Sequence, residues 1–362
     1  MTDLEVLVAL NSVDIGYRRF NRLLECFDTA QEILTASIGK LTRIEGIGEE
    51  LASRIASIKK QDLEKEFETA KKLKLNIITI YDKDYPENLK EIYDPAIVLY
   101  VKGSFIVEDK NGIAIVGSRR ASLYGLSCAE RFGRELSSLG LTVVSGMARG
   151  VDTAAHKGAM SNHGRTIAVM GSGFAHIYPP ENQGLCEEIA GNGAVISEFP
   201  VFTQPMPQNF PRRNRVISGL SKGVLVIEAA RNSGALITAD FALEQGREVF
   251  SLPGKIDSEN STGTNYLIKQ GAKLVSSVED IIEELDVQPP DKQQADISKN
   301  NTDIELDNEE KVVYNSLSRD PLTLDEICQT SGVDITEVLT ALFRLEMKRA
   351  VRQLPGKRFL KN

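Results

Sequence analysis

The sequence predicts an α/β protein built around a doubly wound parallel sheet, with a small helical domain before it and a winged-helix unit after it. From residue 111 to 285, short apolar runs alternate with glycine loops and helical segments, which is typical of a parallel sheet covered by helices. Residues 1–75 show helical spacing of apolar positions. Residues 311–362 have the rhythm of a helix-turn-helix followed by a β-wing.

Length and composition bound the class of protein. The chain has 362 residues, 41% apolar and 26% charged, enough for two or three globular domains. No apolar run approaches the length of a membrane span, and the N-terminus lacks the basic residues of a signal peptide, so we expect a cytoplasmic protein without membrane contact. Its four cysteines are scattered without metal-ligand spacing. The net charge of −8 restricts any nucleic-acid binding to local basic patches.

The N-terminal helical segment contains a candidate phosphate-binding turn. In LTRIEGIGEELASRIASI, apolar residues recur at helical spacing around Gly46 and Gly48. The pattern resembles a helix-hairpin-helix, whose turn offers backbone N–H groups to a nucleic-acid phosphate. The alternative is a purely structural helical hairpin, which Glu45, Glu49 and Glu50 favour because they repel phosphate.

The central region is expected to hold a series of strands joined mostly by helices. We place the strands at residues 76–80, 96–101, 112–117, 141–144, 166–170, 194–196, 224–227, 248–251 and 272–275. In doubly wound sheets, ligands bind at the carboxyl ends of the strands. Four loops fall at such ends, so we predict that they line one rim: residues 118–120, 145–150, 171–173 and 232–234.

The most informative stretch is residues 209–240, which combines a basic cluster, a buried strand and a glycine turn. Arg212, Arg213 and Arg215 precede residues 216–220, which read as the apolar side of a helix. After the strand, the turn at 232–234 opens another helix, and such a turn aims free N–H groups at an anion. A phosphate-bearing ligand is therefore predicted; the alternative is an ordinary strand–helix turn with solvated arginines nearby.

A nicotinamide cofactor is not expected. Gly171-Ser172-Gly173 is a weak dinucleotide signal because His176 stands where a third glycine is needed. The segment also lies outside the first strand–helix unit, and no acidic residue is placed to bind a ribose. We therefore predict no cofactor of any kind.

The C-terminal part begins with an acidic segment, residues 286–310, which is rich in prolines and amides and predicts a flexible linker. Residues 311–362 follow as a winged-helix-like domain with a basic tail that includes Lys348, Arg349, Arg352 and Lys357. The tail favours contact with a DNA backbone. The alternative is a protein-interaction domain, because no cluster of Arg, Asn or Gln marks a recognition helix.

The segment from about Tyr85 to Leu285 closely resembles the bacterial DNA-processing protein A (DprA/Smf) family. The matching runs include IAIVGSRRAS, VVSGMARGVDTAAHKGAM, GSGFAHIYPPEN, NFPRRNRVISGLSKGVLVIEAARNSGALITA and GTNYLIKQGAKLV. The resemblance implies an extended Rossmann-like domain at 76–285 between the end domains. It also implies a homodimer that binds and protects single-stranded DNA and helps load RecA onto it during natural transformation.

The same resemblance makes Arg119 the best candidate for a DNA contact, with the other arginines as the rest of a basic rim. The candidate stacking partners for bases are Phe174, Tyr178 and Phe210, with ordinary core packing as the alternative for each. The predicted DNA-binding set is Ser118, Arg119, Arg120, Gly146, Arg149, Gly150, Gly171, Gly173, Tyr178, Asn182, Phe210, Arg212, Arg213, Asn214, Arg215, Ser233 and Gly234. The predicted dimer surface is Asn265, Leu267, Ile268 and Gln270. Some members carry a lysine just after the Tyr-Pro pair, where this chain has Pro180-Glu181-Asn182, so we expect that DNA contact to be missing or weaker.

The rival hypothesis is a Rossmann-like hydrolase of nucleotides or phosphoribose. Such an enzyme needs a positioned acid or base, and the available groups are Asp152, His156, Glu198 and Glu228. Each has a structural alternative; Asp152, for example, could cap the helix after Gly150. No pair has a spacing that demands catalysis, so we expect a binding protein without enzymatic activity.

Overall fold

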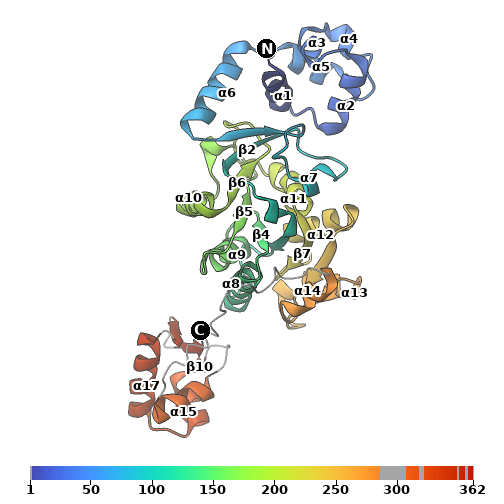
Figure 1. Ribbon diagram of the computed structural model, residues 1–362. Helices are drawn as coiled ribbons and strands as arrows, with labels where there is room; N and C mark the ends of the chain where they lie inside the picture. Colours follow the sequence, from blue (N-terminus) through green and yellow to red (C-terminus); the bar gives the residue numbers. More distant parts are fainter. Residues whose placement is uncertain (1, 286–306, 318–321, 349, 355–357, 362) are drawn as a thin grey trace. The chain divides into compact units, whose positions relative to one another are not determined.

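The computed structural model describes residues 2–285, 307–317, 322–348, 350–354 and 358–361 (Figure 1). The chain divides into two compact units, Met1–Pro290 and Asp291–Asn362. Most of the predicted linker, residues 286–306, lies outside the described residues, as do Arg349 and Lys357 of the basic tail. Among the described residues, no helix combines the length and apolar character needed to cross a membrane.

The described part of the first unit contains a nine-stranded sheet. In spatial order its strands are β1 (Asn76–Thr79), β2 (Val98–Gly103), β6 (Ala194–Ser197), β5 (Thr166–Val169), β4 (Thr142–Ser145), β3 (Gly112–Val116), β7 (Ser221–Val226), β8 (Glu248–Ser251) and β9 (Lys273–Leu274). From β6 to β9 all neighbours are parallel, whereas β2 pairs antiparallel with β6 and with β1. In chain order, β4, β5 and β6 are added one after another on one side of β3, and β7, β8 and β9 are added on its other side. The topological switch point of the sheet therefore lies between β3 and β7.

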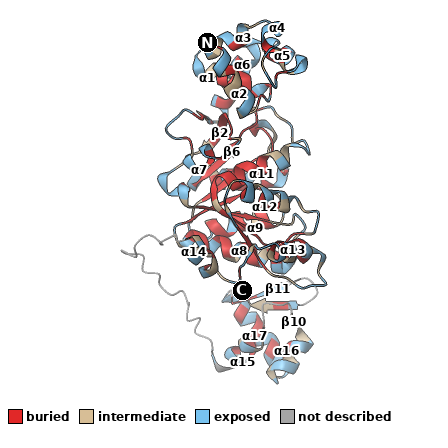
Figure 2. Ribbon diagram, turned by 90° about the vertical axis from the view of Figure 1, so that its right-hand side faces the viewer, coloured by how far each residue is buried: buried red, intermediate tan, exposed pale blue. Residues whose placement is uncertain are grey.

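Helices cover both faces of the sheet, as predicted for a doubly wound fold (Figure 1). The connecting helices are α7 (Glu87–Lys90), α8 (Leu123–Ser138), α9 (Val151–Met160), α10 (Gln183–Asn192), α11 (Asn209–Gly219), α12 (Gly234–Glu244), α13 (Thr262–Lys269) and α14 (Glu279–Leu285). Ile113 and Ile115 of β3 pack with residues of α8 and α9, whereas Ala114 and Val116 pack with residues of α11 and α12. Because successive side chains in a strand point to opposite faces, both faces of β3 are buried, which explains its continuous apolar run. Buried residues gather in the middle of the first unit, around β6 and α11 (red in Figure 2).

The close packing of α8 on α9 depends on two glycines. A Cβ atom on Gly158 would lie 2.1 Å from the carbonyl oxygen of Glu130, and one on Gly133 would lie 2.4 Å from that of Ala155. Side chains at these positions would therefore push the two helices apart. This contact holds the segments that follow β3 and β4 next to each other.

The N-terminal helices are α1 (Asp3–Ser12), α2 (Tyr17–Cys26), α3 (Ala30–Thr35), α4 (Ile38–Leu41), α5 (Glu49–Ala56) and α6 (Lys60–Lys72). The predicted helix-hairpin-helix corresponds to α4 and α5, joined by a turn in which Gly46 has a φ of +87°. At this turn Arg22 of α2 donates a hydrogen bond to the carbonyl oxygen of Glu45 and pairs with its carboxylate. The hydrophobic core of these helices continues into the central sheet through Val98 and Tyr100 of β2.

The second unit is a winged helix by itself. It comprises α15 (Asn308–Ser316), β10 (Leu322–Thr323), α16 (Leu324–Ser331), α17 (Ile335–Met347), β11 (Val351–Leu354) and β12 (Arg358–Lys361), with sheet order β10-β12-β11. The side chain of Asp307 caps α15 and that of Thr323 caps α16, each with a glutamate that bonds back to the cap. Gly332 ends α16 in the left-handed conformation with a φ of +69°. The predicted helix-turn-helix and wing are therefore confirmed.

Candidate nucleic-acid interface

A cavity of about 810 Å³ lies at the switch point of the sheet. Its walls come from segments that follow four strands: residues 117–120 after β3, Ala148 after β4, residues 230–235 after β7, and Glu259 with Asn260 after β8. Tyr178 and the first turns of α11 complete the wall. The predicted loops 118–120 and 232–234 therefore meet, because the carboxyl ends of neighbouring parallel strands share one edge.

Arginines and aromatic rings form a continuous row beside this cavity. The guanidinium carbon of Arg119 lies 5.0 Å from the ring centroid of Phe210, and the rings of Phe210 and Tyr178 are 5.6 Å apart. The guanidinium of Arg149 lies 5.9 Å from the ring of Tyr178. Both arginines are exposed and both rings are half-buried, so we name these four residues the arginine–aromatic row.

Gly171 makes room for the centre of the row. A Cβ atom at this position would lie 2.7 Å from the ring of Phe210. Gly171 was predicted as part of the DNA-binding set, and the structure gives it this packing role beneath Phe210. Gly173 is similarly confined, because a Cβ there would lie 2.1 Å from the carbonyl oxygen of Pro200.

Arg149 shares its charge with a neighbouring carboxylate. Its guanidinium pairs with Glu181, with one bond of 3.1 Å from Nη2 to Oε2 and a shorter one from Nε to Oε1. These hydrogen bonds hold the pKa of Glu181 below its usual range and raise the pKa of Arg149. Glu181 lies in the segment where the sequence lacks the expected lysine, and here its carboxylate competes with any phosphate that Arg149 could bind.

Arg213 lines the cavity, but its guanidinium is used in hydrogen bonds to the backbone of neighbouring segments. Its Nη1 donates to the carbonyl oxygens of Gly146, at 2.6 Å, and of Val169, so it ties α11 to the ends of β4 and β5. Burial lowers the pKa of Arg213 to about 10, while the nearby Asp152 carboxylate counters this effect. Burial also raises the pKa of Asp152, which accepts a hydrogen bond from the N–H of Ala148 at 3.2 Å.

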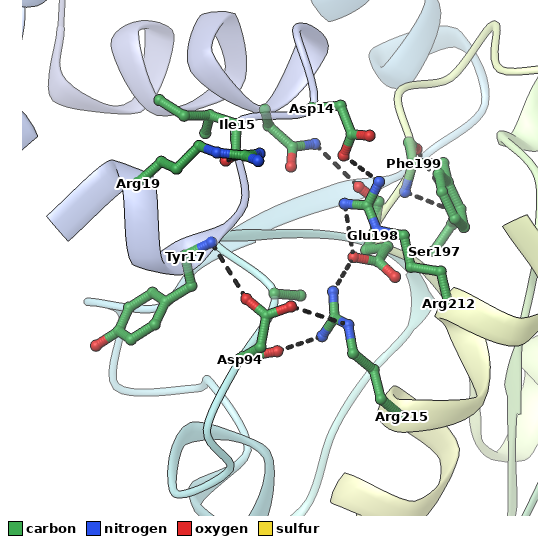
Figure 3. A network of polar contacts seen from close by, with 12 residues as sticks. Asp14, Ile15, Tyr17, Arg19, Asp94, Ser197, Glu198, Phe199, Arg212 and Arg215 are labelled. Atoms are coloured by element: carbon green, nitrogen blue, oxygen red, sulfur yellow. Dashed lines mark hydrogen bonds and ion pairs between the residues drawn. The ribbon is translucent and has the colours of Figure 1, made fainter. Parts of the chain in front are cut away.

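Arg212 and Arg215 do not line the cavity, and this placement corrects the predicted basic rim. Both side chains meet the buried carboxylate of Glu198, which directly follows β6 (Figure 3). Arg212 also pairs with Asp14 of the loop after α1, and the Nε of Arg215 lies 3.4 Å from Asp94 Oδ2. Their spacing of three residues puts both on the face of α11 that turns toward the N-terminal helices.

Further contacts join the same region to the N-terminal helices. Asn11 of α1 donates to the carbonyl oxygen of Glu198 at 2.9 Å. The N–H of Tyr17 donates to Asp94 Oδ1 at 3.3 Å (Figure 3). We call Glu198, Arg212, Arg215, Asp14 and Asp94 the Glu198 network. It positions α11, whose opposite face carries Phe210 into the cavity.

The remaining predicted DNA-binding residues mostly shape the loops. The buried amide of Asn182 donates to the Met147 carbonyl oxygen and to Thr153, and Asn214 donates to the carbonyl oxygen of Gly234 at 3.1 Å. Gly150 has a φ of +76° and packs on the loop after β3. Three further hydrogen bonds support these loops. The N–H of Arg120 donates to Ser118 Oγ, the N–H of Ala235 donates to Ser233 Oγ, and the N–H of Ser118 donates to the Glu228 carbonyl oxygen.

One residue that the sequence analysis did not single out, Asn260, supports the loop of the exposed arginines. Asn260 donates from its side chain to the carbonyl oxygen of Arg120 at 3.2 Å, and its own carbonyl accepts from Ala229 at 2.7 Å. Glu228, considered above as an acid or base, accepts from the N–H of Ser122 at 2.9 Å and from its hydroxyl, so it fixes the start of α8. The position of Asn260 after β8 was the available signal, because that loop also reaches the carboxyl edge of the sheet.

The predicted dimer surface is only partly exposed. Leu267 is buried in the core of the unit, and Asn265 is bonded through its amide to the backbone of Gly254. Ile268 is half-buried and Gln270 is exposed. Ile268 lines a hollow of about 560 Å³ whose other members include the exposed side chains of Ile256, Tyr266 and Leu274.

The buried His156 gives the fold a defined response to acid. Its Nδ1 lies 2.7 Å from Thr166 Oγ1, whose hydroxyl donates to the Val143 carbonyl oxygen, so Nδ1 carries the proton. Among the described residues, Nε2 has no hydrogen-bond partner. Burial, aided by the charge of Arg213, lowers the pKa of His156 from 6.5 to about 3.

We expect the free energy of unfolding to fall as the pH drops from 6.5 toward 3, because only the unfolded state protonates His156 in that window. Each pH unit should cost about 1.4 kcal/mol from this group. Urea denaturation at several pH values measures this effect. Between pH 6.5 and 3, the free energy of unfolding should fall less steeply with pH in His156→Gln than in the unchanged chain. If the free energies of unfolding of the two proteins depend on pH with the same slope, His156 does not cause the loss of stability in acid.

Each of the three predicted domains matches a known protein family. Residues 76–286 match the family DNA recombination-mediator protein A, residues 298–357 match the DprA winged helix domain, and residues 14–57 match a SAM-like helix-hairpin-helix tandem. Protein Smf of Escherichia coli is 38% identical over 310 residues, covering 84% of this chain and 82% of that protein.

Two solved structures share the fold. That of DNA processing protein A from Streptococcus pneumoniae has 36% identity and a TM-score of 0.69, covering 80% of this chain and 99% of that one. That of DNA processing protein A from Helicobacter pylori has 31% identity and a TM-score of 0.52, covering 58% and 95%. With the family match over more than half of its length, the chain belongs to the DNA recombination-mediator protein A family.

Proposed function

We propose that this protein acts in the cytoplasm, where it binds single-stranded DNA along the arginine–aromatic row without catalysing a reaction on it. The row at the carboxyl edge of the sheet is the observation that carries this function. The exposed guanidiniums of Arg119 and Arg149 suit phosphates, and the rings of Phe210 and Tyr178 offer faces to bases. The solved Helicobacter pylori relative is described by its single-stranded DNA binding mode, which supports the assignment.

The physical basis favours single strands over duplexes. Guanidinium–phosphate contacts are independent of sequence and weaken as salt rises, because binding releases counterions. Stacking on a protein ring needs a base whose face is free, and each such stack contributes about 1–3 kcal/mol. In a duplex those faces are occupied by neighbouring base pairs.

A gel-shift comparison of single- and double-stranded DNA of equal length tests the proposal. We expect tighter binding of the single strand at every salt concentration and a loss of affinity as salt rises. Equal affinity for the duplex, or no binding of either, would contradict the proposed function.

The hydrolase alternative has less support in the geometry. Of the four acid–base groups considered, Asp152 lines the cavity and is held by Arg213 and the N–H of Ala148. His156, Glu198 and Glu228 are buried in structural contacts outside the cavity wall. Release of free base from nucleoside monophosphates would revive this alternative.

The family name supports a further step, in which the bound strand is passed to a RecA-type recombinase during natural transformation. The protein would then hold DNA exposed for that partner rather than alter it. Recombinase filament formation on the strand should begin sooner when this chain is present. An unchanged rate would contradict the loading role.

Glu181 is expected to weaken DNA binding, because its carboxylate occupies the charge of Arg149. We predict that Glu181→Lys tightens single-strand binding several-fold at low salt. The salt dependence should steepen by about 0.7 for each added phosphate contact. Glu187→Lys is the matched control, since Glu187 is likewise exposed and paired, but its partner is Lys102, which is no member of the arginine–aromatic row. An equal gain in both variants would indicate only a general charge effect.

We also infer a homodimer through the hollow that Ile268 lines. A charge at a symmetric interface is buried on both sides and is costly, so Ile268→Glu should sediment as a folded monomer. Ile106→Glu, which alters an exposed apolar side chain elsewhere, should remain dimeric. An intact Ile268→Glu dimer would exclude this surface from the interface.

A further inference from the structure

The outer face of α17 is an apolar row. Ile335, Leu339, Phe343 and Met347 follow one another at intervals of four residues, which places them along one side of the helix. Their exposed fractions are 46%, 47%, 65% and 72%. The opposite face, which includes Val338, Leu342 and Leu345, forms the core of the winged helix, so the exposed row is in addition to what the fold needs.

This row does not fit the reading of DNA bases. In helix-turn-helix proteins the recognition helix enters the major groove and contacts base edges with residues such as Arg, Asn and Gln. On α17 the exposed ridge is apolar, and the exposed Glu346 lies beside it, where its carboxylate would repel phosphates. A continuous exposed apolar row instead marks a surface for protein association.

We propose that α17 docks antiparallel on α17 of a second copy of this chain. A twofold axis between Leu339 and Phe343 would place each Leu339 against the partner copy's residue 343, and each Ile335 against residue 347. The row is therefore complementary to itself, as a twofold interface requires. Rows of residues four apart are also the ridges that most often interlock when two helices pack.

The charges on α17 set the direction of the pairing. Asp334 and Glu337 lie at its N-terminal end, whereas at its C-terminal end Arg344 and Lys348 outweigh the single carboxylate of Glu346. An antiparallel pair brings these carboxylates close to the Arg344 of the other copy, whereas a parallel pair would place like charges together. Arg344 bonds to Asp307 through Nη1 at 3.1 Å and is half-exposed; its five N–H donors leave capacity for a second carboxylate. Antiparallel helix dipoles add to the same preference.

This contact is independent of the proposed DNA site and of the proposed surface at Ile268. It assigns the winged helix a role in self-association. With a second self-contact on the same chain, the protein can bring several copies together on one strand of DNA.

Disulfide mapping in the full chain tests the pairing. In a background of Cys26→Ser and Cys328→Ser, which removes the thiols that are not fully buried, Leu339→Cys and Phe343→Cys chains of different mass are oxidised alone and as a mixture. We expect the mixed 339–343 cross-link to exceed both homodimeric cross-links. Lys311→Cys, exposed on α15, measures random collision. Dominant 339–339 linkage, or no linkage above the control, would overturn the proposal.

A second measurement does not rely on introduced thiols. Sedimentation velocity of Leu339→Glu should show a lower average mass than the unchanged chain at equal concentration, with unchanged affinity for single-stranded DNA at low protein concentration. Because Leu339 is exposed, the substitution should leave the fold intact. An unchanged circular dichroism spectrum would show that a lower mass does not result from misfolding. An unchanged mass distribution would contradict pairing through α17.

Discussion

Replacing Glu198 with alanine is expected to lower the free energy of unfolding by about 3–5 kcal/mol, the usual cost of breaking a buried ion pair from one side. The side chain of Glu198 is 3% exposed and its Oε2 binds both Arg212 and Arg215. Without Glu198, the guanidiniums of Arg212 and Arg215 keep only the carboxylates of Asp14 and Asp94 as partners. The loss arises from that uncompensated charge more than from the missing attraction.

Urea denaturation followed by far-ultraviolet circular dichroism measures this effect. Glu187→Ala provides the control because Glu187 forms an exposed pair with Lys102, and such surface pairs contribute at most about 1 kcal/mol. Glu198→Gln retains the shape and should be less damaging, although it also removes the charge. A loss below about 1 kcal/mol in Glu198→Ala would show that the Glu198 network does not fix α11 on the N-terminal helices.

Replacing Phe210 with alanine is expected to weaken single-strand binding by about ten- to a hundredfold. The ring lies between the guanidinium of Arg119 and the ring of Tyr178. Its removal deletes one stacking face, which contributes about 1–3 kcal/mol. It also leaves Arg119 without the ring that orients its guanidinium.

Fluorescence anisotropy with labelled single-stranded DNA measures the loss. Phe202→Ala is a matched control because Phe202 is an exposed ring beneath Lys65, at 4.7 Å, and lies outside the cavity wall. Phe210→Tyr should keep most of the affinity, since it keeps the ring. If both alanine variants bind as tightly as the unchanged chain, Phe210 only packs on Gly171.

The sequence predicted the sheet and the meeting of its loops for a physical reason. Strands buried on both faces, such as Gly112–Val116, are short continuous apolar runs, and parallel connections bring their carboxyl ends to one edge. The loops at 118–120 and 232–234 therefore converge as expected. The arginines at 212 and 215 were misplaced because only residues 216–220 were assigned to a helix, whereas α11 begins at Asn209.

Helical spacing from Asn209 would have separated the two faces of α11. Phe210, Arg213, Asn214 and Ile217 follow the i, i+3, i+4, i+7 pattern and line the cavity. Arg212 and Arg215 lie on another face. Their partners at Glu198 and Asp14 are brought near only by the tertiary fold, across as many as 198 positions in the chain for Arg212 and Asp14, so no local pattern could reveal the Glu198 network.

The central claim, that single-stranded DNA binds at the exposed arginines of the switch-point cavity, is tested most directly by the salt dependence of Arg119→Ala. Affinities for one single strand are measured across a salt series for the unchanged chain, for Arg119→Ala and for Arg134→Ala, which alters an exposed arginine of α8 outside the cavity wall. The account predicts weaker binding and a slope shallower by about 0.7 for Arg119→Ala alone. A folded Arg119→Ala protein with the affinity and slope of the unchanged chain would contradict it.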